Sequence, residues 1–227
     1  GDRRMKITNT KEVSSRRFIA LIAAESGVGK TYQARFLPNE ETLIISAEAG
    51  LLCLKGSNID VCEINSMKDL EEVYLDLARG TKYKYIFIDS VTEIAEKLLA
   101  DMKKMTEYAD RSKAFVLYGD YSSKLTDMLK AFRDLQQYSV IMTCLTAKEK
   151  DGLQMVDALQ MPGQKVASAI RSWFDLVLHL QAFEKDGVKH RAFVCDNMVS
   201  PLAKDRSGSL DQYEQANIAD VMKKVLG

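Results

Sequence analysis

An eight-residue segment between an apolar run and a helical pattern constrains this chain most. It reads Ala24, Glu25, Ser26, Gly27, Val28, Gly29, Lys30 and Thr31. A small residue, four free positions and Gly-Lys-Ser/Thr form the pattern of a phosphate-binding P-loop. Gly27 and Gly29 let the backbone curl so that several N–H groups face one phosphate, and Lys30 places a cation near the β- and γ-phosphates. Thr31 offers a hydroxyl to Mg²⁺ and begins a helix whose positive end faces the anion.

The sequence on either side of this loop is what the motif requires. Residues 17–23 predict a buried strand, and a helix is expected from Lys30 until just before Pro38. Ala24 stands where glycine is commoner, but alanine is also small. The alternative is an ordinary strand–turn–helix joint that happens to be rich in glycine. We therefore predict that the chain binds ATP or ADP, with Mg²⁺ as cofactor.

Apolar runs and helical patterns alternate along the rest of the chain. Further buried strands are expected near residues 42–47, 85–89 and 139–145, with a short one near 60–64. Two last strands are expected near residues 175–183 and 188–195. Capping boxes at Ser66 and Ser90 predict helices between strands, and the turn at 185–187 predicts a hairpin. This alternation predicts an α/β fold with a mostly parallel central sheet, covered on both faces, and a C-terminal antiparallel strand pair.

The chain reads as one domain over residues 17–227, preceded by an N-terminal extension, residues 1–16. Residues 105–119 have no clear period. Residues 146–162 are polar, contain Gly152 and Pro162, and predict a long loop. Long loops in compact domains are usually functional or mobile, so this segment is a candidate binding loop.

Two acidic residues are expected beside the P-loop. Asp89 ends the strand 85–89, where a carboxylate can hold the magnesium shell of a nucleotide. The alternative for Asp89 is a helix cap, a role that Ser90 already fills. Glu48 follows another buried strand, at the sheet edge where ligands bind and where a group that activates water is needed. From these residues alone, Glu48 fits a solvated loop position better than a catalytic one.

Composition narrows the function classes. The 32 Lys and Arg residues balance 32 Asp and Glu residues, so the chain lacks a strongly basic field that would hold nucleic acid by itself. The four cysteines are scattered and form no C-x-x-C pair, which argues against a zinc or redox site. No stretch approaches the roughly 20 apolar residues of a membrane span. A cytoplasmic protein that does not engage a membrane is expected.

Several segments together resemble one family. Residues 45–50 are similar to the glutamate-bearing strand end of RecA-type recombinases, and residues 86–91 are similar to their magnesium strand. Residues 118–121, Thr143 and residues 204–208 fit the same family. The resemblance is to phage-encoded RecA-like nucleotide-binding proteins, among them the Sak-type single-strand annealing proteins. It runs from about residue 17 to 226 and implies a RecA-like three-layer αβα sandwich.

The resemblance also implies roles for individual residues. Glu48 would activate the attacking water, Asp89 would hold the Mg²⁺ shell, and Thr143 would sense the γ-phosphate, although many relatives carry other polar residues there. Lys204 and Arg206 lie in a segment similar to the Lys-x-Arg-x-Gly of ring helicases, where these cations reach the neighbouring subunit's ATP site. An arginine there stabilises the charge of the transferred phosphoryl group. The alternative is a solvated charged turn.

The resemblance further implies a DNA partner and an assembly. RecA-like proteins place single-stranded DNA against loops near a ring axis, and residues 105–119 and 146–162 match those loops. Their basic and aromatic side chains suit backbone contact and base stacking: Lys113, Lys148, Lys150, Tyr108, Phe115 and Tyr118. Acidic residues at 107, 110, 149 and 151 dilute the charge, so ordinary surface loops fit equally well. A homo-oligomer, ring or filament, in a bacterial host cytoplasm is expected.

The function that these features favour is an ATP hydrolase of phage or prophage origin, acting in DNA recombination or single-strand annealing. Two alternatives stay open. A nucleotide or small-molecule kinase would use the same P-loop, although an arginine-rich lid is missing between residues 105 and 165 beyond Arg111 and Arg133. An assembly module would bind ATP with little turnover. His179 and His190 are expected to be structural or at the surface.

Overall fold

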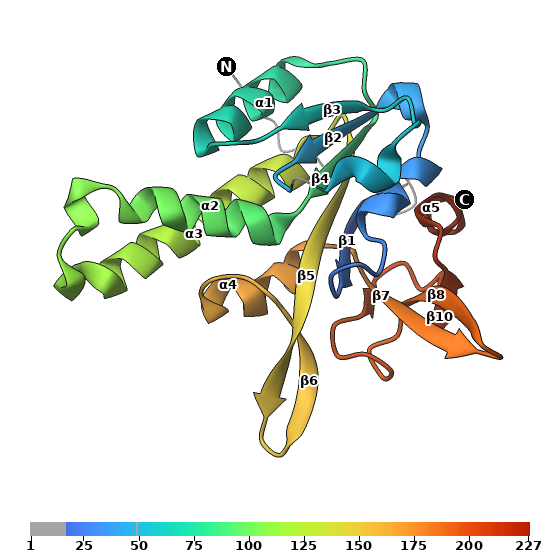
Figure 1. The fold of residues 1–227 in the computed structure, drawn as a ribbon. Coiled ribbons are helices and arrows are strands. Elements are labelled where there is room, and N and C mark those ends of the chain that lie inside the picture. The colour runs from blue at the N-terminus through green and yellow to red at the C-terminus, as the bar shows by residue number, and fades with distance from the viewer. Residues whose placement is uncertain (1–16, 49) are drawn as a thin grey trace, which may run out of the picture.

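The computed structural model describes residues 17–48 and 50–227, so the expected N-terminal extension lies outside the described residues. Its centre is a mostly parallel sheet with the strand order β3-β2-β4-β5-β1-β7-β8-β10 (Figure 1). The parallel strands are β1 (Ile19–Ala24), β2 (Thr42–Ser46), β3 (Asp60–Glu63), β4 (Tyr85–Asp89), β5 (Ser139–Asp151) and β7 (Leu176–Lys185). Every residue of β1 is buried, which explains its unbroken apolar sequence.

Antiparallel pairs extend this sheet. They involve β6 (Gln154–Leu159), β8 (Val188–Val194), β9 (Lys204–Asp205) and β10 (Tyr213–Gln215). The predicted C-terminal strand pair is confirmed as the β7–β8 hairpin. Its turn contains Asp186 at φ 53° and Gly187 at φ 73°, the two left-handed positions that a tight hairpin turn needs.

Helices cover both faces of the sheet. One face packs against α1 (Met67–Arg79), α2 (Val91–Lys103), α3 (Ala114–Arg133) and α4 (Gln164–Ala169). The other face packs against the 3₁₀ helix η2 (Thr31–Phe36) and α5 (Ile218–Leu226). Alternate strand residues supply the two cores: Ile86 and Ile88 face one, and Phe87 faces the other. The predicted α/β fold, with a mostly parallel central sheet covered on both faces, is thereby confirmed.

Short 3₁₀ helices occupy several connections. They are η3 (Asn39–Glu41), η4 (Leu51–Leu54), η5 (Thr106–Tyr108), η6 (Arg111–Lys113) and η7 (Ile170–Trp173). The predicted helix after the P-loop, η2, is likewise a 3₁₀ helix. Leu37 is extended because Pro38 follows it, which leaves room for only six residues. Such short runs commonly adopt the tighter 3₁₀ geometry.

The predicted long loop at 146–162 is wrong. Strand β5 continues to Asp151 and returns as β6, with Thr146 opposite Leu159 and Asp151 opposite Gln154. This hairpin, the β5–β6 hairpin, projects from the body of the molecule (Figure 1). Its outer half is exposed on both faces, so no apolar alternation marks it in the sequence. Residues 111–116, which lead into and begin α3, are likewise exposed, so the segment 105–119 also shows no apolar period.

The two predicted capping boxes have different outcomes. At α1, Ser66 accepts from the backbone N–H of Asp69, and the Asp69 carboxylate accepts from the backbone of Ser66, so the box is complete. At α2, Ser90 accepts from the backbone N–H of Glu93, while the Glu93 side chain lines a cavity. Within residues 17–48 and 50–227, no helix combines the length and apolarity needed to cross a bilayer.

Candidate nucleotide-binding site

A cavity of about 890 Å³ opens at the carboxyl edge of the sheet, beside the P-loop. Its walls come from the P-loop, the segments after β2 and β3, and the first turns of α2. Because parallel strands end at the same edge of a sheet, residues distant in sequence meet here. Lys30, Thr31 and Glu48 line this cavity together.

The P-loop backbone adopts the curl that the motif predicts. Gly27 has φ 75° and Gly29 has φ 113°, values that other residues rarely adopt. Lys30 is buried, and its Nζ donates to the carbonyls of Ala24 at 3.2 Å and Glu25 at 3.0 Å. Burial lowers the pKa of Lys30, while the nearby carboxylates of Glu48 and Asp89 raise it. The lysine is therefore folded back over the cradle that a phosphate would enter.

Asp89 lies at the centre of a buried polar cluster and is 1% exposed. Thr31 Oγ1 donates to Asp89 Oδ2 at 2.5 Å, and Thr143 Oγ1 donates to Asp89 Oδ1. Burial raises the pKa of Asp89, and the hydrogen bonds from Thr143 and Thr31 oppose that shift. Thr143 thus directly orients the carboxylate, and its expected contact with a γ-phosphate stays a prediction.

The Thr31 hydroxyl and the Asp89 carboxylate fit a magnesium ion. Both are hard oxygen ligands and lie side by side beside the cradle. Mg²⁺ usually keeps several waters and takes its other oxygens from nucleotide phosphates, so one carboxylate and one hydroxyl suffice. The described part of the chain holds no cluster of three or more His, Cys, Asp or Glu residues that would suit a metal held by protein alone.

Glu48 is half-buried on the cavity wall. Its Oε1 accepts a hydrogen bond from Ser90 Oγ at 2.7 Å, and its carbonyl accepts from Ser46 Oγ at 2.8 Å. The parallel register places Ser46 opposite Asp89, which brings the two strand ends together. Sequence reasoning identified Ser90 as a helix cap and missed its contact with Glu48. The only available signal was the position of Ser90 directly after Asp89.

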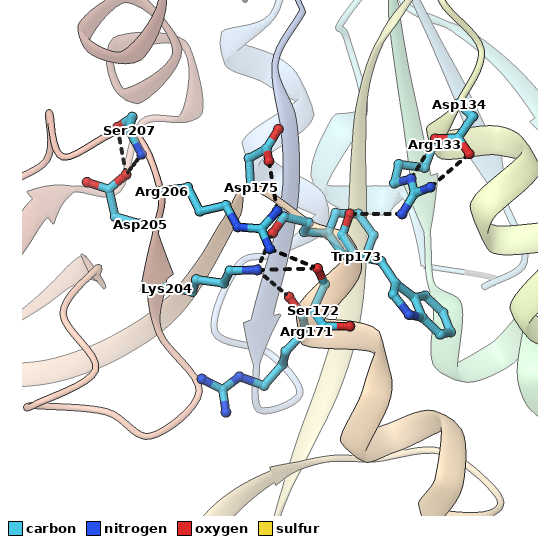
Figure 2. A network of polar contacts seen from close by, with 11 residues as sticks. Arg133, Asp134, Arg171, Ser172, Trp173, Asp175, Lys204, Asp205, Arg206 and Ser207 are labelled. Carbon is cyan, nitrogen blue, oxygen red and sulfur yellow. Dashed lines mark hydrogen bonds and ion pairs between the residues drawn. The ribbon is translucent and has the colours of Figure 1, made fainter.

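Lys204 and Arg206 do not reach the chain's own phosphate cradle. Lys204 Nζ donates to the carbonyls of Arg171 at 3.1 Å, Ser172 at 3.4 Å and Phe174 at 2.7 Å (Figure 2). Arg206 forms an ion pair with Asp175 at 3.4 Å.

The sheet register places these cations away from the loop. Lys204 pairs with Val177, which lies beside Leu21, three residues before β1 ends at Ala24. Lys204 is therefore roughly 10 Å from the start of the P-loop along the sheet. The predicted action of Lys204 and Arg206 on ATP would thus have to occur on another subunit.

Arg191 of β8 is a site residue that sequence reasoning missed. Its Nε donates to the carbonyl of Val28 at 2.7 Å, across 163 positions of the chain. A Cβ atom placed on Gly29 would lie 3.6 Å from the same nitrogen. The sequence around Arg191 carries no motif that marks it as a site residue. Only the β7–β8 register brings it to the P-loop.

The predicted DNA-contacting residues divide into two groups. Lys148 is paired across the β5–β6 hairpin with Asp157 at 2.7 Å, and the Tyr108 hydroxyl donates to Asp120 at 2.7 Å. Lys150 is exposed, and Phe115 is 91% exposed. The hairpin tip also carries fully exposed Leu153 and largely exposed Met155. The accessible groups therefore lie at the projecting ends of the hairpin and of α3.

Comparison with known proteins identifies a family model that covers most of the chain. A family model described as an AAA domain matches residues 16–207. Among solved structures, a KaiC-like protein from the hyperthermophilic archaeon Pyrococcus horikoshii OT3 is similar, with 17% identity and a TM-score of 0.42. That alignment covers 77% of this chain and 76% of that chain. No relative was found among the curated proteins.

Proposed function

Because this chain belongs to the AAA_24 family of AAA domains, which are P-loop domains, we propose that it binds and hydrolyses ATP. The observation that carries this proposal is the arrangement around one cavity of three groups with different tasks. Lys30 and Glu48 line the cavity, and Asp89 lies buried directly behind the Thr31 hydroxyl that also lines it. P-loop hydrolysis needs a cation, a magnesium shell and a group that orients water.

The residues of the chain have separable roles in this proposal. Lys30 exchanges its carbonyl partners for phosphate oxygens, since a buried ammonium group is stabilised by a new anion. Magnesium, when bound with the nucleotide, neutralises charge on the phosphates. Glu48 orients the attacking water and accepts its proton, while Ser90 fixes the direction of the carboxylate. Thr143 and Thr31 hold Asp89 in one orientation.

The biological setting belongs to the same proposal. The chain is a phage or prophage protein that acts in recombination or single-strand annealing, as an oligomer. The exposed Lys150, Phe115 and Leu153 support contact with single-stranded DNA, since cations bind the backbone and apolar or aromatic groups contact bases. The position of Arg206 away from its own cradle supports a site that is completed by a neighbouring subunit.

One experiment tests hydrolysis, DNA binding and assembly together. Phosphate release from Mg-ATP is measured with and without single-stranded DNA, while light scattering reports particle size. We expect turnover that DNA stimulates together with a shift to rings or filaments. The Lys30→Ala variant controls for contaminating ATPases and should lose turnover. If the assembled wild-type protein binds ATP without releasing phosphate, the hydrolase proposal is wrong and an assembly module takes its place.

A further inference from the structure

A smaller cavity, of about 430 Å³, adjoins the P-loop and is named here the Arg191 pocket. Beyond the P-loop glycines, its walls are Tyr32, Gln33, Cys53, Arg191, Gln215 and Ala216. Tyr32 and Cys53 also line the large cavity, so the two spaces meet along the second half of the loop. A ligand seated in the P-loop can therefore extend into both.

The positions of the carboxylates fix which way a nucleotide must run. Glu48 lines the large cavity and lies near Asp89, so the terminal phosphate belongs on that side. The ribose and base must therefore extend from the P-loop on a different side from Glu48. A third cavity, of about 730 Å³, faces the first half of the loop, but its three carboxylates, Glu25, Asp157 and Glu184, outnumber its two lysines, Lys148 and Lys189. The Arg191 pocket has no carboxylate in its lining, which makes it the better neighbour for a polyphosphate.

The chemistry of the Arg191 pocket suits a flat, partly polar group. A Cβ atom on Gly29 would lie 3.6 Å from Arg191 Nε and 3.9 Å from Tyr32 Cβ, so both side chains border the same point above the loop. Guanidinium planes and aromatic rings are surfaces on which nucleobases stack. Arg191 Nε is committed to the Val28 carbonyl, and among the described residues its terminal nitrogens make no further hydrogen bond or ion pair.

The far wall of the pocket is held in place by Gln33, which is 2% exposed. Gln33 Nε2 donates to the carbonyl of Ala216 at 3.2 Å, and Gln33 Oε1 accepts from the backbone N–H of Ile218 at 3.0 Å. Both contacts join η2, directly after the P-loop, to the segment that contains Gln215. The pocket is thus built before a ligand arrives, which lowers the entropy cost of binding.

We propose that the Arg191 pocket holds the base and ribose of the bound nucleotide, with the Arg191 guanidinium lying against the base. This inference rests on the proposed binding of ATP. It assigns Arg191 the role of a specificity-determining residue, distinct from the groups that hold the phosphates. It also explains why an arginine from β8, so distant in sequence, contacts the backbone of the P-loop.

Calorimetric titration with two ligands tests this assignment. Mg-ATP and Mg-tripolyphosphate share a phosphate chain, but only ATP has a nucleoside. We expect Arg191→Ala to weaken ATP binding roughly tenfold more than it weakens tripolyphosphate binding, because both ligands lose the nearby charge but only ATP loses the contact with its base. The matched control is Lys185→Ala, which removes an exposed cation at the tip of the same β7–β8 hairpin and should change neither affinity. Equal losses for both ligands, or no loss for ATP, would overturn the assignment.

A second variant tests the pocket without altering Arg191. Ala216→Phe places a ring in the space between η2 and β8, and circular dichroism melting establishes that it folds. We expect it to lose ATP affinity and to keep tripolyphosphate affinity. If wild-type protein binds tripolyphosphate as tightly as ATP, the nucleoside pocket is refuted while the P-loop assignment stands. If wild-type protein binds neither ligand, the proposed function itself fails.

Discussion

The Glu48 carboxylate is held by Ser90, which also caps helix α2. Ser90 Oγ donates to Glu48 Oε1 and accepts from the backbone N–H of Glu93, so one hydroxyl joins the proposed water-orienting group to the first turn of α2. A carboxylate held this way has one oxygen left for water. The arrangement favours a base that is already oriented before the nucleotide binds.

Replacing Glu48 with Gln tests its role as the base. The amide keeps the size of the side chain but cannot accept a proton, so we expect ATP binding to persist while turnover falls by about 10²- to 10⁴-fold. Nucleotide titration and single-turnover phosphate release measure the two quantities. The control is Glu63→Gln, an exposed carboxylate on the same cavity wall. Comparable losses of turnover in both variants would show that the negative charge of the cavity wall matters, and not Glu48 as a specific base.

His179 gives the fold a predictable dependence on pH. It is 3% exposed, its Nδ1 lies 2.7 Å from Ser200 Oγ, and burial lowers its pKa, which fits the expected structural role. Asp157 and Glu25 act to raise the pKa, and Lys148 acts to lower it. The unfolded chain therefore takes up the proton first, at a pH near the ordinary value of about 6.5.

The free energy of unfolding should accordingly fall as the pH drops below about 6.5, with a slope of at most ~1.4 kcal/mol per pH unit, until the folded pKa is reached. Urea unfolding at several pH values measures the slope. We expect His179→Gln to flatten it and His190→Gln, at an exposed position, to leave it in place. The chain has only these two histidines, so a slope that survives in His179→Gln excludes this explanation.

At the scale of the elements, Lys204 joins the short strand β9 to the end of η7. Its three carbonyl acceptors all lie between Arg171 and Phe174, where a helix ends and its carbonyls lack partners. Arg206 instead pairs with Asp175 where both side chains are exposed. Arg206 Nη2 also donates to the Ser172 carbonyl at 3.5 Å, so the two cations share that acceptor and differ in their remaining partners.

We expect Lys204→Ala to lower the free energy of unfolding by about 1 kcal/mol, since charged hydrogen bonds at a partly exposed helix end are lost. Arg206→Ala should change stability by no more than about 0.5 kcal/mol, because exposed ion pairs contribute little. Urea melts of both variants give these values, and ATPase assays accompany them. Normal stability with lost turnover in Lys204→Ala would instead place this lysine at a neighbour's phosphate.

The β5–β6 hairpin carries the proposed DNA contact, and its two lysines differ. Lys148 already has Asp157 as a partner, whereas Lys150 is exposed nearer the tip. We expect Lys150→Ala to weaken binding of single-stranded DNA and to reduce the dependence of log affinity on log salt by about 1. Fluorescence anisotropy over a salt series measures both. Lys185→Ala, at the tip of the β7–β8 hairpin, is the matched control and should bind DNA like the wild-type chain.

Local patterns were sufficient for the elements that form the core. The P-loop, Asp89 and the buried strands are each written in a few consecutive residues, because apolar runs and strand-end polar groups reflect the sheet directly. The β5–β6 hairpin escaped prediction because its outer half packs against nothing. The contacts of Ser90 with Glu48, Arg191 with Val28 and Lys204 with its carbonyls depend on strand order and register, which single segments do not specify.

At the scale of the whole molecule, Arg206 lies away from the phosphate-binding loop of its own chain. A site shared between subunits can therefore be tested by mixing two inactive variants. If each site combines Glu48 of one subunit with Arg206 of the next, Glu48→Gln and Arg206→Ala are each inactive alone. An equal mixture should regain turnover at about one site in four, since each heterologous interface pairs one site with one neighbour. Phosphate release from mixed and separate variants measures this. A mixture as inactive as its components would rule out the shared site.

The Gln33 amide has a consequence for how the protein is made. It joins η2 to a backbone carbonyl 183 positions later and to an N–H two positions beyond that. During synthesis, chains emerge at about 5–20 residues per second, and early segments can fold before late ones appear. Here the P-loop leaves the ribosome first but lacks a wall until Ala216 follows it. A nascent chain should therefore not bind nucleotide tightly until translation has passed Ala216 and Ile218.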